Sequence, residues 1–124
     1  MKITTAKVQS PPCMVLAIDG KVVGTGATEL ENALQQVMAE GETRLVLDLT
    51  AAPIISSAGL RVIIVTTKRA RALPSGDLRL AGLSQQMLDV LELAGLLTVL
   101  KVYPSQQAAI ESFQTANRSP VASG

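Results

Sequence analysis

Two adjacent serines lie where an apolar segment gives way to a helical pattern, and they are the residues of this chain best placed to do chemistry. Ser56 and Ser57 can offer hydroxyl oxygens to the unpaired backbone N–H groups of the helix that follows. Gly59, in the first turn of that helix, lets another molecule approach the backbone closely. We therefore expect an exposed, pre-oriented and easily modified hydroxyl at this junction.

The composition excludes several classes of function. The chain has no histidine, so Ser-His-Asp and Cys-His catalysis, His-ligated zinc and His-based pH switching are all excluded. A formal net charge of +1 and an aromatic content of 2% argue against nucleic-acid binding, because the chain as a whole has no electrostatic attraction to phosphate backbones and no aromatic platform on which bases could stack. We expect no metal site and no cofactor. The loop Gly20–Thr28 matches neither a dinucleotide-binding loop nor a P-loop.

Length and hydropathy indicate one domain outside the membrane. A chain of 124 residues is a natural size for a single domain. Its apolar runs are far shorter than the roughly 20 residues that cross a bilayer, so we expect no direct membrane insertion. The N-terminus lacks a hydrophobic signal segment, and the single cysteine, Cys13, excludes an internal disulfide. We expect a cytoplasmic protein in which Cys13 is a small hydrophobic filler.

The apolar pattern of the first third predicts a hairpin followed by a helix. Residues 14–18 form a short apolar strand that ends at the turn pair Asp19-Gly20, and Val22-Val23 is expected to continue the sheet on the other side of that turn. Thr28 is expected to cap a helix that Gly41 ends.

The remaining elements alternate between strand and helix. The expected elements are a central strand at 44–49, a helix at 57–73, a strand at 78–81, a helix at 84–93 that Gly95 closes, a strand at 98–103 and a last helix opened by Ser105. This alternation predicts an α/β fold, a mixed β-sheet with an opening hairpin packed against about four helices. Residues 117–124 have the composition of a disordered tail.

The segment 48–60 resembles the signature of STAS-domain anti-sigma factor antagonists, which are bacterial switch proteins. The matching residues are Asp48, Leu49 and Thr50 at the strand end and Gly59 and Leu60 at the helix start. Ser57 aligns with the serine that is phosphorylated in that family. Ser56 replaces the usual aspartate, Ala58 replaces a second serine, and Val23 stands where an acidic residue is usual. The resemblance implies a single STAS-like domain over residues 1–116.

The resemblance also implies a mechanism and partners. The unphosphorylated protein would bind an anti-sigma factor that is itself a serine kinase of the histidine-kinase-like ATPase type. Phosphorylation of Ser57 would release that partner, and a PP2C-like phosphatase would reset the switch. The kinase would supply ATP, magnesium and base, so this chain is not expected to be an enzyme. Besides Ser57, with Ser56 as a second acceptor, the expected partner-binding residues are Gly20, Lys21, Thr25, Asp48, Thr50, Ser56, Ala58, Gly59, Leu60 and Arg61.

Several alternatives remain open from the residues alone. Ser57 is either the phosphate acceptor or an ordinary helix cap. Asp48 is either a functional neighbour of Ser57 or a strand-end carboxylate that bonds backbone donors. The loop Gly20–Thr28 is a plain flexible loop or a contact rim. At the level of the whole protein, similar STAS proteins are accessory subunits of lipid-transport ATPase complexes or scaffold subunits of stress-signalling assemblies, and a serine hydrolase is disfavoured by the missing histidine.

Overall fold

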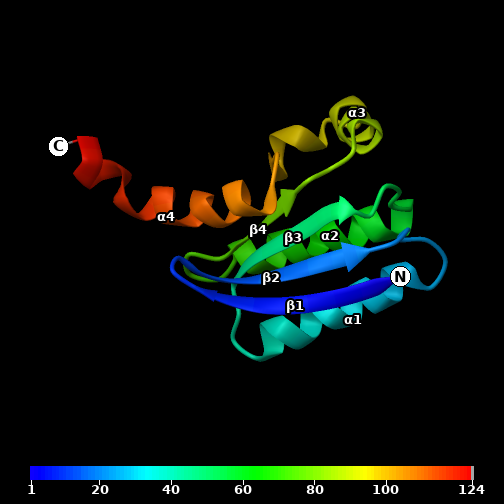
Figure 1. The fold of residues 1–124 in the computed structure, drawn as a ribbon, viewed down its shortest axis with the longest axis horizontal. Helices are drawn as coiled ribbons and strands as arrows, with labels where there is room; N and C mark the ends of the chain where they lie inside the picture. The colour runs from blue at the N-terminus through cyan, green and yellow to red at the C-terminus, as the bar shows by residue number, and fades with distance from the viewer. Residues whose placement is uncertain (124) are drawn as a thin grey trace.

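In a computed structural model that describes the backbone of residues 1–123 and the side chains of residues 1–114, the chain forms one five-stranded sheet with four helices. The strands lie in the order β1-β2-β3-β4-β5 (Figure 1). β1 is antiparallel to β2, and the other neighbours are parallel. In chain order the elements are β1 (Lys2–Gln9), β2 (Pro12–Asp19), α1 (Gly26–Ala39), β3 (Arg44–Ala51), α2 (Ser57–Arg71), β4 (Asp77–Ala81), α3 (Gln85–Leu93), the 3-10 helix η1 (Leu96–Thr98), β5 (Lys101–Tyr103) and α4 (Gln106–Ser123). The predicted α/β class with a mixed sheet is confirmed.

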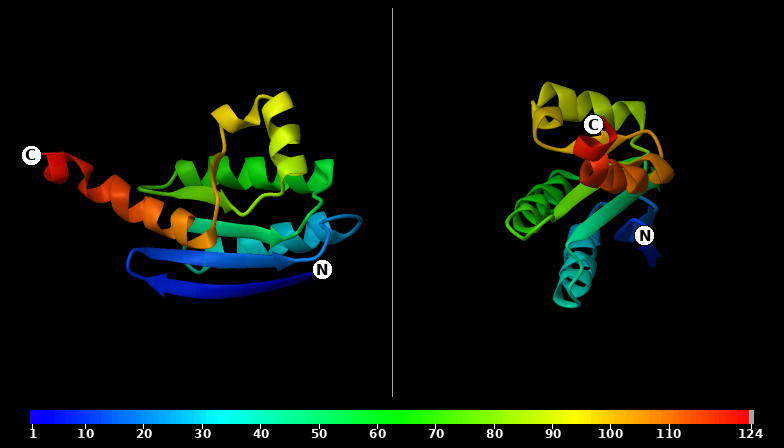
Figure 2. Two further views of the ribbon diagram at one scale, coloured as in Figure 1. Left: turned by 45° about the horizontal axis from the view of Figure 1, so that its top comes forward. Right: turned by 90° about the vertical axis from the view of Figure 1, so that its left-hand side faces the viewer.

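Helices cover the two faces of the sheet unequally. α1 and α2 lie on one face, and α4 lies across the other (Figure 2). The larger apolar cluster, which includes Leu34 and Ile63, lies between the sheet and α1 and α2. A smaller cluster, which includes Cys13 and Phe113, lies beneath α4. Burial raises the pKa of the Cys13 thiol, so the thiol stays protonated at neutral pH, as expected of a hydrophobic filler.

β3 is the central strand, as its apolar sequence predicts. Leu45 and Leu47 belong to the larger cluster, whereas Val46 belongs to the smaller one. Side chains alternate between the two faces of a strand, so Asp48, which shares the side of Val46, faces α4. That placement matters for the candidate site, because it separates Asp48 from the helices on the opposite face.

The opening hairpin exists, but it lies earlier in the chain than predicted. β1 and β2 pair from Lys2 with Asp19 to Gln9 with Pro12. The predicted pairing across Asp19-Gly20 is wrong, because Val22 instead forms an isolated parallel bridge with Ile55. β1 escaped prediction because it is an exposed edge strand with mostly polar residues, whereas Val22 is fully buried in the core.

The helix boundaries agree with the sequence at most ends but not at the start of α1. Thr28 lies inside α1 rather than at its cap; Thr25 takes the N-cap position without a side-chain hydrogen bond. Ser84 caps α3, and Ser105 caps α4 as predicted; their hydroxyl oxygens accept hydrogen bonds from the N–H groups of Met87 and Ala108 at 3.2 and 3.1 Å. Gly41 follows α1 with a φ of +97°, a backbone conformation that favours glycine.

In the last third, the final strand and the final helix differ in extent from the predicted elements. The predicted strand at 98–103 is shorter, because η1 occupies Leu96–Thr98 and β5 begins only at Lys101. α4 extends to Ser123, so it overlaps the segment 117–124 predicted as a tail; those side chains lie outside the described ones, and the boundary at residue 116 stays a prediction.

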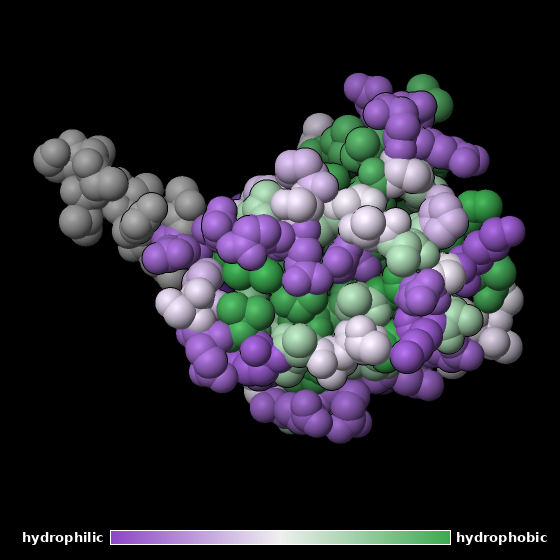
Figure 3. Space-filling model, viewed as in Figure 1, coloured by the Kyte–Doolittle hydropathy of each residue, from purple (hydrophilic) through white to green (hydrophobic). Residues whose placement is uncertain are grey.

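Exposed apolar side chains gather around α3 and η1. Val90 and Leu93 of α3 and Leu97 of η1 are among them. Figure 3 shows hydrophobic patches between hydrophilic side chains in this part of the surface. Within the described part of the chain, none of the helices has the length and apolar character needed to cross a membrane.

Candidate functional site

The junction between β3 and α2 is built around Ser56, which caps the helix. The Ser56 hydroxyl oxygen accepts a hydrogen bond from the N–H of Gly59 at 3.1 Å, and its carbonyl oxygen accepts one from the N–H of Leu60 at 2.9 Å. The backbone of Ser56 is extended, with φ −68° and ψ 165°, as N-cap residues require. The interpretation of Ser57 as the helix cap is therefore wrong, because the preceding serine has that role.

Ser57 is the first residue of α2, and its side chain is exposed. Among the described residues, no hydrogen bond engages its hydroxyl. The N–H groups of Ser57 and Ala58 precede the first intrahelical hydrogen bond, so they add partial positive charge at this end of the helix. The arrangement leaves a free hydroxyl at a helix end that favours negative charge.

A shallow hollow of about 410 Å³ lies beside Ser57, between the starts of α1 and α2. We call it the Ser57 hollow, and its lining comprises Ala27, Thr28 and Glu31 from α1 and Ser57, Ala58, Arg61 and Val62 from α2. Glu31 and Arg61 supply one charge of each sign, and Arg61 lies one helical turn after Ser57. The sequence did not identify the α1 residues as part of the site, because only tertiary packing brings α1 against α2. Their helical spacing, which places them on one face of α1, was the available signal.

The loop between β2 and α1 lies beside the start of α2. The N–H of Gly20 donates to the carbonyl oxygen of Ala51 at 2.9 Å. The N–H of Val22 donates to the carbonyl oxygen of Ile54 at 2.9 Å, and the carbonyl oxygen of Val22 accepts from the N–H of Ser56 at 2.8 Å. These bonds hold the exposed residues Lys21 and Thr25 at the same end of the sheet as Ser57.

Gly59 has a different role from the one expected. It is buried, and a Cβ atom added to it would lie 2.8 Å from Cγ2 of Ile55 and 3.0 Å from Cγ1 of Val22. The close approach that glycine permits is therefore made by the protein's own core. Leu60, half-buried, packs against the same core, while Arg61 is exposed.

Substitution of Gly59 tests this packing. We expect Gly59→Ala to lower the free energy of unfolding by about 1–3 kcal/mol, because the added methyl group overpacks the contact with Ile55 and Val22. Chemical denaturation monitored by circular dichroism measures the change. Ala58→Ser, at the exposed neighbouring position, is the control and should stay within about 0.5 kcal/mol of wild type. Equal stability of Gly59→Ala and wild type would contradict the packing role.

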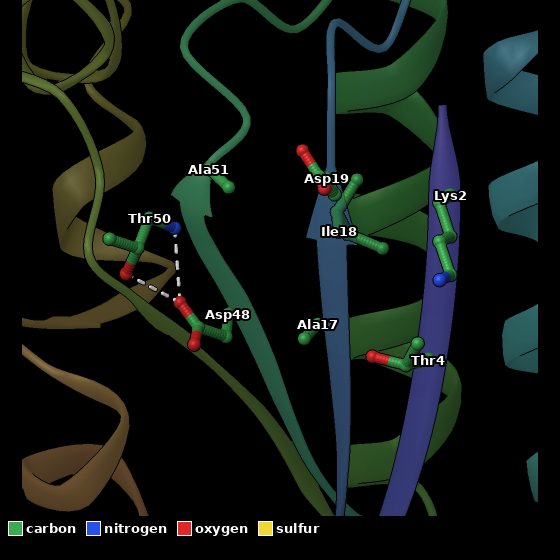
Figure 4. Close-up of a pocket in the computed structure, with 8 residues that line it drawn as sticks. All are labelled: Lys2, Thr4, Ala17, Ile18, Asp19, Asp48, Thr50 and Ala51. Atoms are coloured by element: carbon green, nitrogen blue, oxygen red, sulfur yellow. Dashed lines mark hydrogen bonds between the residues drawn. The ribbon is translucent and has the colours of Figure 1, made fainter.

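Asp48 and Thr50 lie on the opposite face of the sheet from the Ser57 hollow. One Asp48 oxygen accepts hydrogen bonds from the N–H of Thr50 at 3.0 Å and from its hydroxyl at 2.6 Å. The other oxygen accepts one from the Gln106 amide of α4 at 2.8 Å. The two residues line a separate hollow of about 280 Å³ with Asp19 and Lys2 (Figure 4). This geometry is that of a strand-end carboxylate bonding a backbone donor; a contact of Asp48 or Thr50 with a partner stays a prediction.

The Asp48 hydrogen bonds predict an acid-dependent contribution to stability. Desolvation raises the pKa of Asp48, but the hydrogen bonds from Thr50 and Gln106 together outweigh it, and the net pKa is lowered. The stabilisation is therefore present above the unfolded pKa of about 4 and is lost as pH falls through the lower folded pKa. We expect Asp48→Asn to be less stable than wild type at pH 7, with the difference shrinking below about pH 4. Urea unfolding across this pH range tests it, and a difference independent of pH would contradict it.

Comparisons with known proteins agree with the geometry. The family model of the STAS domain matches residues 4–109. A Bordetella bronchiseptica protein named as an anti-sigma factor antagonist, BtrV, is 36% identical over 116 residues, which cover 94% of this chain and 97% of BtrV. Among solved structures, an anti-sigma factor antagonist from Mycobacterium paratuberculosis superposes with a TM-score of 0.76 at 24% identity, covering 91% of this chain and 95% of that one. SpoIIAA from Bacillus, solved in its phosphorylated form, superposes with a TM-score of 0.66 at 15% identity, covering 86% and 96%.

Proposed function

Because the chain belongs to the STAS-domain family, we propose that it is an anti-sigma factor antagonist whose affinity for its partner is set by phosphorylation of Ser57. The observation that carries the proposal is the exposed Ser57 hydroxyl at the first residue of α2, left free because Ser56 caps the helix. The name of BtrV and the phosphorylated form of SpoIIAA support the proposal.

The proposed phosphoryl transfer requires only an accessible acceptor hydroxyl from this chain. In the proposed step, the Ser57 oxygen attacks the γ-phosphorus of ATP bound to the partner kinase, the bond from that phosphorus to the bridging oxygen of ADP breaks, and a base of the kinase takes the hydroxyl proton. The products are phosphoserine and ADP. The positive end of α2 stabilises the new charge of about −1.5 to −2, and Arg61 lies one turn away. The fold should therefore tolerate the phosphate.

The partner is expected to lose affinity when the phosphate forms. Ser57 lies at the rim of a hollow that the starts of α1 and α2 form, next to the loop that contains Lys21 and Thr25. A partner docked on this surface would have to desolvate a dianion at the centre of the contact, which costs several kcal/mol unless a cation compensates it. The proposed partners are a serine kinase of the histidine-kinase-like ATPase type that acts as the anti-sigma factor, and a PP2C-like phosphatase that removes the phosphate. A cytoplasmic location is part of the same proposal.

Phosphorylation with a candidate kinase tests the proposal. The purified protein is incubated with each histidine-kinase-like ATPase of its native cell and ATP, and the phosphate is located by mass spectrometry. We expect one kinase to modify Ser57 and the Ser57→Ala variant to stay unmodified. Ser56→Ala is the matched control; it weakens the helix cap by about 1 kcal/mol but keeps the acceptor. Modification of Ser56 alone, or no modification by any of these kinases, would contradict the proposal. Recovery of a lipid-transport ATPase as the bound protein would favour the accessory-subunit alternative.

A further inference from the structure

A third hollow, of about 340 Å³, lies at the end of the sheet opposite to Ser57. It forms where β3, β4 and β5 begin and α2 ends. Four cationic side chains line it, those of Arg44, Arg71, Arg79 and Lys101, and Asp77 is the acid among the described lining residues. We call it the Asp77 hollow.

The single carboxylate is fully engaged by its surroundings. One Asp77 oxygen accepts from Nε of Arg71 at 2.8 Å and from the N–H of Leu78 at 2.9 Å. The other accepts from Nε of Arg79 at 3.0 Å and lies 3.8 Å from Nζ of Lys101. Arg71, the last residue of α2, is therefore partly committed to this cluster. One negative charge is shared among three cations.

The hollow contains more positive charge than the carboxylate of Asp77 can neutralise. Nε of Arg44 donates to the carbonyl oxygen of Ser75 at 3.2 Å, and that neutral acceptor does not offset the charge. The four cations are a large share of the eleven Lys and Arg residues of the chain, whereas Asp77 is one of ten acids. A chain with a net charge of +1 thus concentrates an excess of positive charge in one hollow. Like charges gathered in this way repel one another unless an anion joins them.

One of the cations is held rigidly. Arg79 is 7% exposed; its Nη1 donates to the Ser112 hydroxyl at 2.7 Å, and its guanidinium lies 4.1 Å from the centroid of the Phe113 ring. Hydrogen bonds to Asp77 and Ser112 at the edge of the guanidinium, together with the Phe113 ring against its flat face, fix the orientation of the group. A guanidinium fixed in this way loses little conformational entropy when it binds an additional oxyanion.

We propose that the Asp77 hollow binds a small polyvalent anion of the phosphate class. Guanidinium groups match phosphate oxygens in geometry and charge, and two or more such groups around one hollow favour a polyphosphate over a single carboxylate. The volume falls within the range of small-ligand pockets of roughly 300–1,000 Å³, which favours a small ligand over an extended acidic protein surface. The site is remote from Ser57 and goes beyond the proposed switch.

Calorimetric titration with inorganic triphosphate tests the proposal. We expect binding at one site per chain and a rise in thermal midpoint when triphosphate is present. The double variant Arg44→Gln and Lys101→Gln removes two charges without breaking the bonds from Arg71 and Arg79 to Asp77, and it should bind at least about tenfold more weakly. The matched control is the double variant Lys68→Gln and Arg69→Gln, which removes two exposed charges outside the hollow and should bind as wild type does.

Three results would overturn the proposal. They are no detectable binding to the folded wild-type protein, equal weakening by the two double variants, and tighter binding of a hexaglutamate peptide than of triphosphate. The second would indicate non-specific attraction, and the third would indicate a docking surface for an acidic protein. None of them bears on phosphorylation of Ser57, so failure of this inference is distinguishable from failure of the proposed function.

Discussion

The Ser57→Asp variant is expected to bind the partner kinase at least about 100-fold more weakly than wild type, as measured by surface plasmon resonance or calorimetry. The new carboxylate lies at an exposed position beside the Ser57 hollow, so a docked partner must desolvate it. A desolvated charge without a compensating cation costs several kcal/mol, and each 1.4 kcal/mol is a factor of ten in affinity. The positive N-terminal end of α2 stabilises the carboxylate, so the variant should remain folded.

Two control variants separate the effect of charge at Ser57 from other effects. Ser57→Ala removes the hydroxyl without adding charge and should keep wild-type affinity. Ser105→Asp places the same carboxylate at the cap of α4, which lies on the other face of the sheet, and should also keep wild-type affinity. The mechanism is wrong if Ser57→Asp binds as tightly as Ser57→Ala.

The Asp77→Asn variant is expected to lose about 3–5 kcal/mol of unfolding free energy. Asp77 is 5% exposed and holds together Arg71, Arg79 and Lys101. Asparagine has nearly the same shape but no charge, so the buried guanidinium of Arg79 would lose its counter-ion within a cluster of like charges. Removing one partner of a buried ion pair is costly for this reason. Urea denaturation at pH 7 measures the loss.

The control for this prediction is a carboxylate outside the buried cluster. Asp89 is exposed on α3 and accepts one hydrogen bond, from Gln85, so Asp89→Asn should change stability by less than about 0.5 kcal/mol. A loss in Asp77→Asn as small as that in Asp89→Asn would mean that solvent already screens the cluster.

Long elements were predictable because most of their local signals agree. α2 was predicted despite its β-branched residues, since its length, its basic last turn and the following Pro74 indicate a helix. β3 was predicted because its sequence is dominated by Leu and Val and alternates only weakly, which is typical of a strand covered on both faces. β1 was not predicted, because its side chains are mostly polar and show little apolar periodicity. Its strand conformation depends on pairing with β2 and not on its own sequence pattern.

The candidate site was predictable only in part. The serine pair marks the helix start, but sequence does not decide which serine caps the helix, since a shift of one residue exchanges their roles; the bond from Gly59 to Ser56 decides it. The burial of Gly59 depends on the bridge between Val22 and Ile55, which no local pattern indicates. The Asp77 hollow was missed because it requires the register of β4 against β5, which places Arg79 opposite Lys101.

The most direct test is the affinity of one partner kinase for the same protein before and after stoichiometric phosphorylation of Ser57, followed by treatment with a PP2C-like phosphatase. If a dianion at the first residue of α2 excludes the partner, the phosphorylated protein binds at least about 100-fold more weakly and regains full affinity once the phosphate is removed. Equal affinity of the phosphorylated and unphosphorylated proteins would contradict the account.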